Sequence, residues 1–235
     1  MATAASGPPQ GGIDFGRSFT FVGEDPEWPK KVLVGGAFML ACAILVGLPF
    51  VLGYFSRTLR NAAAGTHPTL PEWEDLGGIF EEGLRLTAVY LVCTLGMLVV
   101  LGVFAAALLL PVFLASGANG PHDALGALGV LGIVAFYAST MLVSLVLALY
   151  LPAGLTRATL RGSVAEAFAW RENLGFIKAN LANYALALVS YLLAAFAAQF
   201  GFLLCCVGVF PAAFWSYLVL ACALGQTARL SSTPV

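Results

Sequence analysis

Apolar residues occur in four runs that are long enough to cross a bilayer, and most polar residues lie between them. The runs cover residues 86–114, 125–151, 181–202 and 207–224. A helix needs about 20 apolar residues to cross the hydrocarbon core, where only helices or closed barrels satisfy the backbone. The runs lack the two-residue alternation of barrel strands. The pattern therefore predicts an all-α polytopic transmembrane helical bundle with four full spans.

A fifth apolar segment, residues 32–55, precedes these runs and has a break in its middle. The break is Gly47-Leu48-Pro49, where proline lacks a backbone donor and clashes with the preceding turn. The segment is either a fifth, kinked span or a re-entrant hairpin with a turn at Gly47, Leu48 and Pro49. In the hairpin, helices over residues 32–45 and 48–59 reach about 18–21 Å each, too short for a core of about 30 Å.

The basic residues favour the hairpin. If the segment is re-entrant, all 11 Lys and Arg residues share one side of the membrane. A single span instead separates Arg17, Lys30 and Lys31 from the others. Because Lys and Arg are enriched in cytoplasmic loops, we predict that residues 58–68 and 157–178 lie inside and residues 115–124 outside. Both interpretations place the C-terminus in the cytoplasm.

Two polar segments are predicted to form interfacial helices. The first starts in the interfacial motif Leu70, Pro71, Glu72, Trp73, Glu74 and Asp75. Pro71 suits the first position of a helix, and the acids complement its dipole. We predict a helix over residues 71–85, with Trp73 and Phe80 buried against the bundle or the lipid headgroups. The second helix follows Ser163, which has the spacing of a capping box with Glu166.

The composition fits a membrane protein. Of the 235 residues, 60% are hydrophobic and 10% are charged, and the mean hydropathy is +0.92. A soluble domain carries about 25% charged residues, so this chain has too little polar surface to cover a water-soluble sphere. The net charge of −1, without a basic stripe, argues against nucleic-acid binding. We expect a multi-pass protein of the cell (cytoplasmic) membrane.

The beginning of the chain is polar and rich in Ala, Gly and Pro, without the basic and apolar regions of a cleaved export signal. We predict a flexible N-terminal tail over residues 1–20 and a single transmembrane helical domain over residues 21–230. Residues 231–235 are expected to form a C-terminal tail.

The sequence contains no recognisable pattern of reactive residues. Its five cysteines lie in or beside apolar runs, without the spacing of a zinc or haem site. The acids of residues 72–82 point to several faces of a helix and have no histidine beside them. The four apolar runs contain no Asp, Glu, Lys or Arg, which argues against an ion-coupled carrier. We predict no catalytic, cofactor-binding or metal-binding residue.

Several motifs occur in a characteristic order: Trp28-Pro29-Lys30-Lys31, Gly53-Tyr54, and Leu70-Pro71-Glu72-Trp73-Glu74-Asp75. In this order the chain resembles the domain-of-unknown-function family 4013, a group of uncharacterised prokaryotic polytopic membrane proteins. The resemblance covers about residues 27–228 and is most specific in the last motif. It implies a break inside the first apolar segment, which Gly47 and Pro49 reproduce. It implies a fold and a membrane location but no mechanism.

Three classes of function remain open. The first is a non-enzymatic accessory or scaffolding protein that associates with other membrane protein subunits as well as the lipid bilayer, with no nucleic acid. The second is a channel or carrier for a neutral or lipidic solute, because re-entrant segments often line cavities. The third is an enzyme that acts on lipid. The missing chemistry favours the first.

Overall fold

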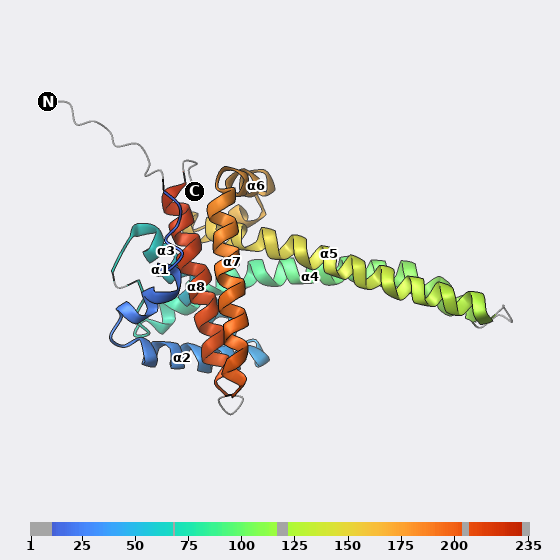
Figure 1. Cartoon of the computed structure of the whole chain (residues 1–235), viewed down its shortest axis with the longest axis horizontal. Helices are drawn as coiled ribbons and strands as arrows, with labels where there is room; N and C mark the ends of the chain where they lie inside the picture. The colour runs from blue at the N-terminus through green and yellow to red at the C-terminus, as the bar shows by residue number, and fades with distance from the viewer. Residues whose placement is uncertain (1–10, 68, 117–121, 204–206, 232–235) are drawn as a thin grey trace. The chain divides into compact units, whose positions relative to one another are not determined.

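The computed structural model describes residues 11–67, 69–116, 122–203 and 207–231 (Figure 1). Within these residues every regular element is a helix and none is a strand. Four helices are long and apolar enough to cross a membrane: Leu76–Leu108, Gly129–Arg161, Leu181–Leu203 and Val209–Leu230. The predicted all-α fold with four candidate spans is confirmed.

The elements follow one another along the chain with short connections. In order they are α1 (Arg17–Thr20), the 3-10 helix η1 (Phe21–Glu24), α2 (Trp28–Ala41), η2 (Cys42–Ile44), α3 (Gly47–Ala64), α4 (Leu76–Ser116), α5 (His122–Arg161), η3 (Val164–Phe168), α6 (Trp170–Ala179), α7 (Leu181–Gln199), η4 (Phe200–Leu203) and α8 (Val209–Leu230).

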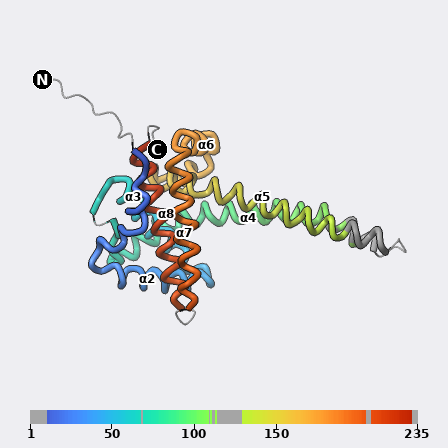
Figure 2. Tube along the Cα trace, in the orientation of Figure 1, coloured from blue at the N-terminus to red at the C-terminus, as the bar shows by residue number. Residues whose placement is uncertain are grey.

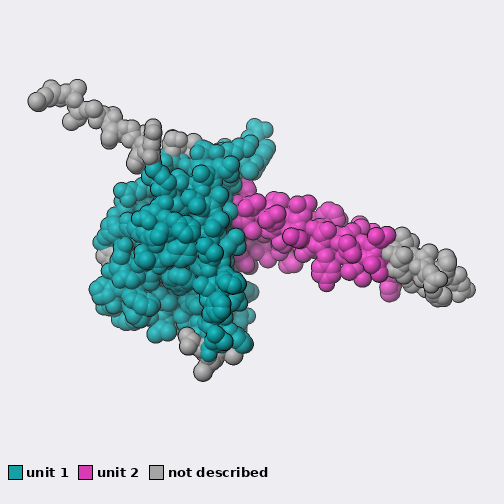
Figure 3. Space-filling view, in the orientation of Figure 1, with its two compact units in different colours: residues 1–89, 152–235 teal, residues 90–151 magenta. Residues whose placement is uncertain are grey.

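The helices divide into two compact units, coloured separately in Figure 3. The first comprises residues 1–89 and 152–235, and the second residues 90–151. Residues 21–230, expected as one domain, are thus shared between two units. The two long helices α4 and α5 each contribute to both.

Helix α8 is the core of the first unit. It packs against α2, α3 and α7, and Figures 1 and 2 show it running alongside α7. Its buried side chains include Phe214 and Leu218. Helix α2 crosses α8 closely because Gly35 and Gly36 have no side chain. A Cβ at Gly35 would overlap the ring of Phe214, and one at Gly36 would lie 2.7 Å from Pro211.

Helix α7 buries its small residues and exposes its large apolar ones. Ala187, Ala194 and Ala198 are buried, whereas Leu192 and Phe196 are 63% and 67% exposed. A water-soluble helix would do the reverse, because burying large apolar side chains is what stabilises it. In a bilayer, small residues let helix backbones approach and large side chains can face lipid. The pattern on α7 is therefore that of a membrane helix.

The second unit consists of the two apolar helix segments of α4 and α5. The most apolar windows of Leu76–Leu108 and Gly129–Arg161 are 0% and 6% buried, against 56% for α8. Exposed side chains include Leu95, Val99, Met141 and Leu142. Half of the predicted outer loop of residues 115–124, namely residues 117–121, lies outside the described residues.

The predicted N-terminal tail is too long. Among its described residues, Ile13 and Ser18 are buried and residues 17–20 form α1. Ile13 joins an apolar cluster with Phe176 and Tyr184, and its backbone N–H donates to the side chain of Asn183 (3.2 Å). These contacts come from residues 163 or more positions away, so local composition could not predict them.

Candidate functional site

The interfacial motif, residues 70–75, joins α2, α3 and α4 and is not itself helical. The predicted helix over residues 71–85 is therefore wrong at its start, because α4 begins at Leu76. The cause is capping by Asp75. Its Oδ1 accepts a hydrogen bond from the backbone N–H of Gly78 (2.9 Å), as the residue before a helix does. Pro71, Glu72 and Glu74 precede this cap.

Trp73 is the centre of an aromatic cluster. Its ring centroid lies 4.3 Å from that of Tyr54 and 5.1 Å from that of Phe38, both stacked. Its indole N–H donates to the carbonyl of Lys31 (3.1 Å), and the Tyr54 hydroxyl donates to the carbonyl of Pro71 (2.9 Å). The motif is thereby fastened to α2 and α3. Leu70 is buried, whereas Phe80, expected to be buried, is 39% exposed.

A partly buried ion cluster lies beside this tryptophan, with the Glu72 side chain 61% exposed. The ammonium of Lys31 is 2.6 Å from carboxylates of both Asp25 and Glu72. The side chains of Lys31 and Asp25 are each only 4% exposed. Burial alone lowers the pKa of Lys31, but the hydrogen bonds that its ammonium donates to Asp25 and Glu72 more than offset this and raise the pKa above the ordinary value. Sequence reasoning treated Lys31 as a surface charge and did not single out Asp25.

A second set of charges joins α3 to the start of α4. Arg57 contacts Asp75 (2.7 Å) and Glu82 (3.0 Å), and Arg60 contacts Glu82 (3.0 Å). The hydrogen bond from Arg57, with that from the Gly78 N–H, lowers the pKa of Asp75. The cap is therefore charged at neutral pH, where it favours the N-terminus of α4.

The chain turns between α2 and α3 close to Gly47, Leu48 and Pro49. Helix α2 ends at Ala41, and Leu45 adopts a left-handed φ of 64°. Gly47 then begins α3, and a Cβ there would overlap the carbonyl of Phe38. Pro49 falls in the first turn of α3, where its missing N–H has no helical partner to lose. The break comes a few residues earlier than the predicted meeting point of the arms.

Contacts with α8 show the direction of the N-terminal third of the chain. The backbone N–H of Asp14 donates to Gln226 near the C-terminal end of α8 (2.8 Å), and Phe19 reaches Trp215 nearer its other end. Helix α3 then runs back. Tyr54 lies beside Phe214, and Gly65, just after α3, lies beside Arg229. Residues 14 and 65 are therefore at the same end of α8.

The second predicted interfacial helix also differs from expectation. Residues Val164–Phe168 form a 3-10 turn and α6 begins at Trp170, with no side-chain cap from Ser163. Glu166 instead pairs with Arg157 (2.5 Å), and this hydrogen bond lowers its pKa. The Glu166 carboxylate is directed toward Arg157 and Arg161. Phe168 and Trp170 are exposed.

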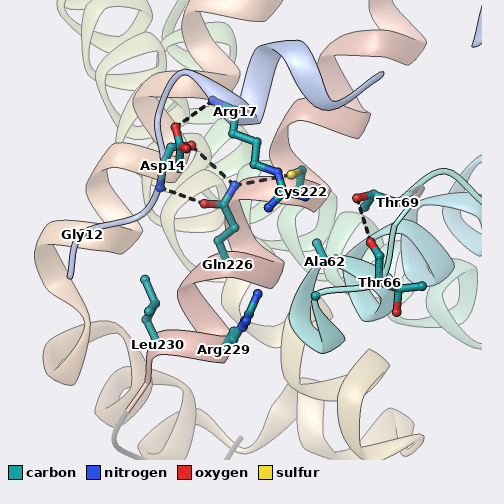
Figure 4. A pocket seen from close by; sticks show the side chains of 11 residues that line it. Gly12, Asp14, Arg17, Ala62, Thr66, Thr69, Cys222, Gln226, Arg229 and Leu230 are labelled. Atoms are coloured by element: carbon teal, nitrogen blue, oxygen red, sulfur yellow. Dashed lines mark hydrogen bonds between the residues drawn. The ribbon is translucent and has the colours of Figure 1, made fainter. Parts of the chain in front are cut away.

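One cavity at the C-terminal end of α8 has a polar lining (Figure 4). Its volume is about 190 Å³. It is lined by Gly12, Asp14, Arg17, Ala62, Gly65, Thr66, Thr69, Cys222, Gln226, Arg229 and Leu230. None of these residues had been singled out as a site residue from the sequence, because they come from three distant segments. Within the described chain, no group of three His, Cys, Asp or Glu side chains is placed to hold a metal ion.

A family model described as "Protein of unknown function (DUF4013)" matches residues 36–207. This range includes the interfacial motif and the turn at Gly47, and it starts after Lys31. Neither a curated protein nor a solved structure matches the chain.

Proposed function

The chain belongs to the DUF4013 family, and since that family has no activity to transfer, the structure itself must indicate a role. We propose that this multi-pass membrane protein is a non-enzymatic accessory or scaffolding component of a prokaryotic cell membrane. It associates there with other membrane protein subunits.

The observation that carries the proposal is the exposure of the second unit. Large apolar side chains face outward along both of its helices, including Leu95 (64% exposed) and Leu142 (62%). In a bilayer, lipid already covers such a surface, so contact with another helix brings no hydrophobic gain. Membrane helices associate instead through close packing of their side chains. A pair of long helices with open faces offers room for helices of another subunit.

The charged groups of the first unit support a structural role. Lys31, Arg57 and Arg157 are each paired with carboxylates from other segments. These pairs connect α2, α3, α4 and the α5–α6 junction. The presence of these three basic residues is explained by the segments that their ion pairs join, without assigning them a part in a reaction.

The positions of residues 14 and 65, which flank the α2–α3 hairpin, support a re-entrant first segment. Residues 14 and 65 lie at the same end of α8. If α8 crosses the membrane, a single crossing between these residues would place them at opposite faces. We therefore propose that the chain between residues 14 and 65, which contains residues 32–55, enters and leaves on one face, the cytoplasmic one, together with the C-terminal end of α8.

A channel or carrier for a neutral or lipidic solute is the second candidate. The break between α2 and α3 favours it, because irregular backbone at membrane depth must be buried in protein or line a cavity. Flux of solute through liposomes containing only the purified protein would support this candidate.

Site-specific photo-crosslinking in intact membranes tests the scaffolding proposal. A photoreactive residue at Leu95 or Leu142 should give discrete protein adducts that persist through purification in mild detergent. Leu192 of α7 is the matched control, since it is 63% exposed and equally apolar. We expect mainly lipid adducts from it. Lipid adducts alone from Leu95 and Leu142 would contradict the proposal.

A further inference from the structure

The polar cavity at the C-terminal end of α8 is bordered by an exposed arginine, Arg229. Among the described residues, Arg229 has no hydrogen bond or ion pair, and its side chain borders the cavity (Figure 4). The other charged lining residues are engaged: Arg17 contacts Glu24 (3.4 Å), and the Asp14 carboxylate accepts from the Arg17 backbone N–H (2.9 Å). Because Glu24 pairs with Arg17, the charges that remain at the lining are those of Arg229 and Asp14.

Arg229 is held in place by the shape of the backbone around it. Gly65 ends α3 with a left-handed φ of 73°, and a Cβ there would lie 2.6 Å from the Arg229 guanidinium. The guanidinium thus rests over the end of α3 and near the end of its own helix. Both helix ends carry partial negative charge. They attract the cation, yet they leave its N–H groups free for a ligand.

The remaining walls provide hydrogen-bonding groups around a hollow that is open to solvent at Thr66 and Arg229. Gln226 holds the N-terminal segment against α8 by accepting from the Asp14 N–H (2.8 Å) and donating to the Ser18 hydroxyl (3.2 Å). The Thr66 hydroxyl borders the cavity and has no partner among the described residues. The volume of about 190 Å³ would hold roughly six water molecules at about 30 Å³ each, which is room for a tetrahedral anion.

We propose that this cavity binds a phosphate group, with Arg229 as its principal ligand and Thr66 as a supporting donor. Guanidinium groups bind phosphate through two parallel hydrogen bonds. The phosphate can belong to an anionic phospholipid or to a small soluble molecule. In the proposed topology the site opens at the cytoplasmic face, where anionic lipids gather. The cavity does not depend on the scaffolding role.

Titrations of the full chain in neutral detergent test the site. The probes are a short-chain phosphatidylglycerol, inorganic phosphate, and short-chain phosphatidylcholine as the zwitterionic control. Binding is followed by the rise in the thermal midpoint of unfolding. We expect the wild-type protein to be stabilised by phosphatidylglycerol, by inorganic phosphate or by both, and much less by phosphatidylcholine.

Two variants assign the binding to the cavity. Arg229→Gln should weaken binding about tenfold, the scale of losing one charge-assisted contact. Arg171→Gln is the matched control, because it removes one guanidinium that lies over the ring of Trp170 and not in the cavity. Gly65→Ala keeps every charge but moves the Arg229 guanidinium, so it should weaken binding as well, even if it also lowers the thermal midpoint of the free protein.

The outcomes separate the sources of the phosphate and can overturn the proposal. A response to phosphatidylglycerol alone assigns the site to lipid, and a response to both probes assigns it to the phosphate group itself. A response to inorganic phosphate alone assigns it to a small anion. Equal weakening by Arg171→Gln and Arg229→Gln, or no response to either anionic probe, would show that the cavity is not a phosphate site. Failure of the scaffolding proposal would leave these results unchanged.

Discussion

At the scale of single residues, Trp73 makes the most varied contacts in the interfacial motif. It stacks on rings from α2 and α3 and donates a hydrogen bond to the backbone of Lys31. Aromatic contacts of this kind add about 0.5–1.5 kcal/mol beyond area burial. The sequence predicted an ordered, packed Trp73, but it placed the residue on a helix. The partners Tyr54 and Phe38 could not be identified because they depend on how α2 folds back on α3.

Replacing Trp73 with Ala is expected to destabilise the protein by about 1–3 kcal/mol, through lost burial and stacking. The free energy of unfolding in detergent is the measurement. Trp170→Ala is the control, because Trp170 is 58% exposed and its removal should change little. Similar losses for the two variants would mean that the aromatic cluster does not stabilise the fold.

Lys31 offers a second test, because its charge is buried with that of Asp25. Lys31→Met should destabilise the protein by about 3–5 kcal/mol, since it leaves a buried carboxylate unpaired. Adding Asp25→Asn to this variant should recover much of the loss. Lys30→Met is the control, because the neighbouring Lys30–Glu27 pair is exposed and worth at most about 1 kcal/mol.

The dependence of the free energy of unfolding on alkaline pH tests the contribution of Lys31 independently. The pKa of Lys31 is raised above its ordinary 10.5. Its stabilisation is therefore complete below pH 10.5 and is lost as pH rises through the folded-state value. The Lys31→Met variant should lack this alkaline loss. An alkaline loss of the same size in wild type and variant would assign it to another group.

At the scale of elements, the apolar runs predicted the helices but not all of their limits. Span length follows from composition alone, so the four long helices were predictable. The start of α4 was not predictable in this way. The helix begins after Asp75 and not at Pro71, because the Asp75 carboxylate accepts a hydrogen bond from the Gly78 N–H. In the same way, Glu166 binds Arg157 instead of completing a capping box. Each outcome depends on a partner outside the local sequence.

The turn between α2 and α3 can be tested with glycine substitutions. Gly47→Ala should destabilise the protein, because its Cβ would overlap the carbonyl of Phe38 and force α2 and α3 apart. Gly96→Ala in α4 is the matched control, since nothing lies within 4 Å of its added Cβ. Alanine also favours a helix interior by about 1 kcal/mol over glycine. Equal thermal midpoints for the two variants would contradict the tight turn.

At the scale of the whole molecule, charge and hydropathy predicted a multi-pass protein, and the family match agrees with the resemblance seen in the motif residues. They could not predict that residues 14–24 run along α8 and bring Asp14 and Arg17 to the polar cavity. That path is determined by Gln226 and Asn183, which are about 170–210 positions away. A sequence without an alignment carries no signal for such pairs.

The central claim is that the chain between residues 14 and 65, which contains the first apolar segment, does not cross the membrane once, so that residues 14 and 65 both lie on the cytoplasmic face with the C-terminal end of α8. Single cysteines at Gly12, Thr66, Leu203 and Ser231, in a cysteine-free background, test this most directly. The measurement is labelling by an impermeant thiol reagent in intact cells and in inverted vesicles. We predict that Gly12, Thr66 and Ser231 are labelled only in inverted vesicles and Leu203 only in intact cells. Labelling of Gly12 and Thr66 from opposite sides would contradict the account.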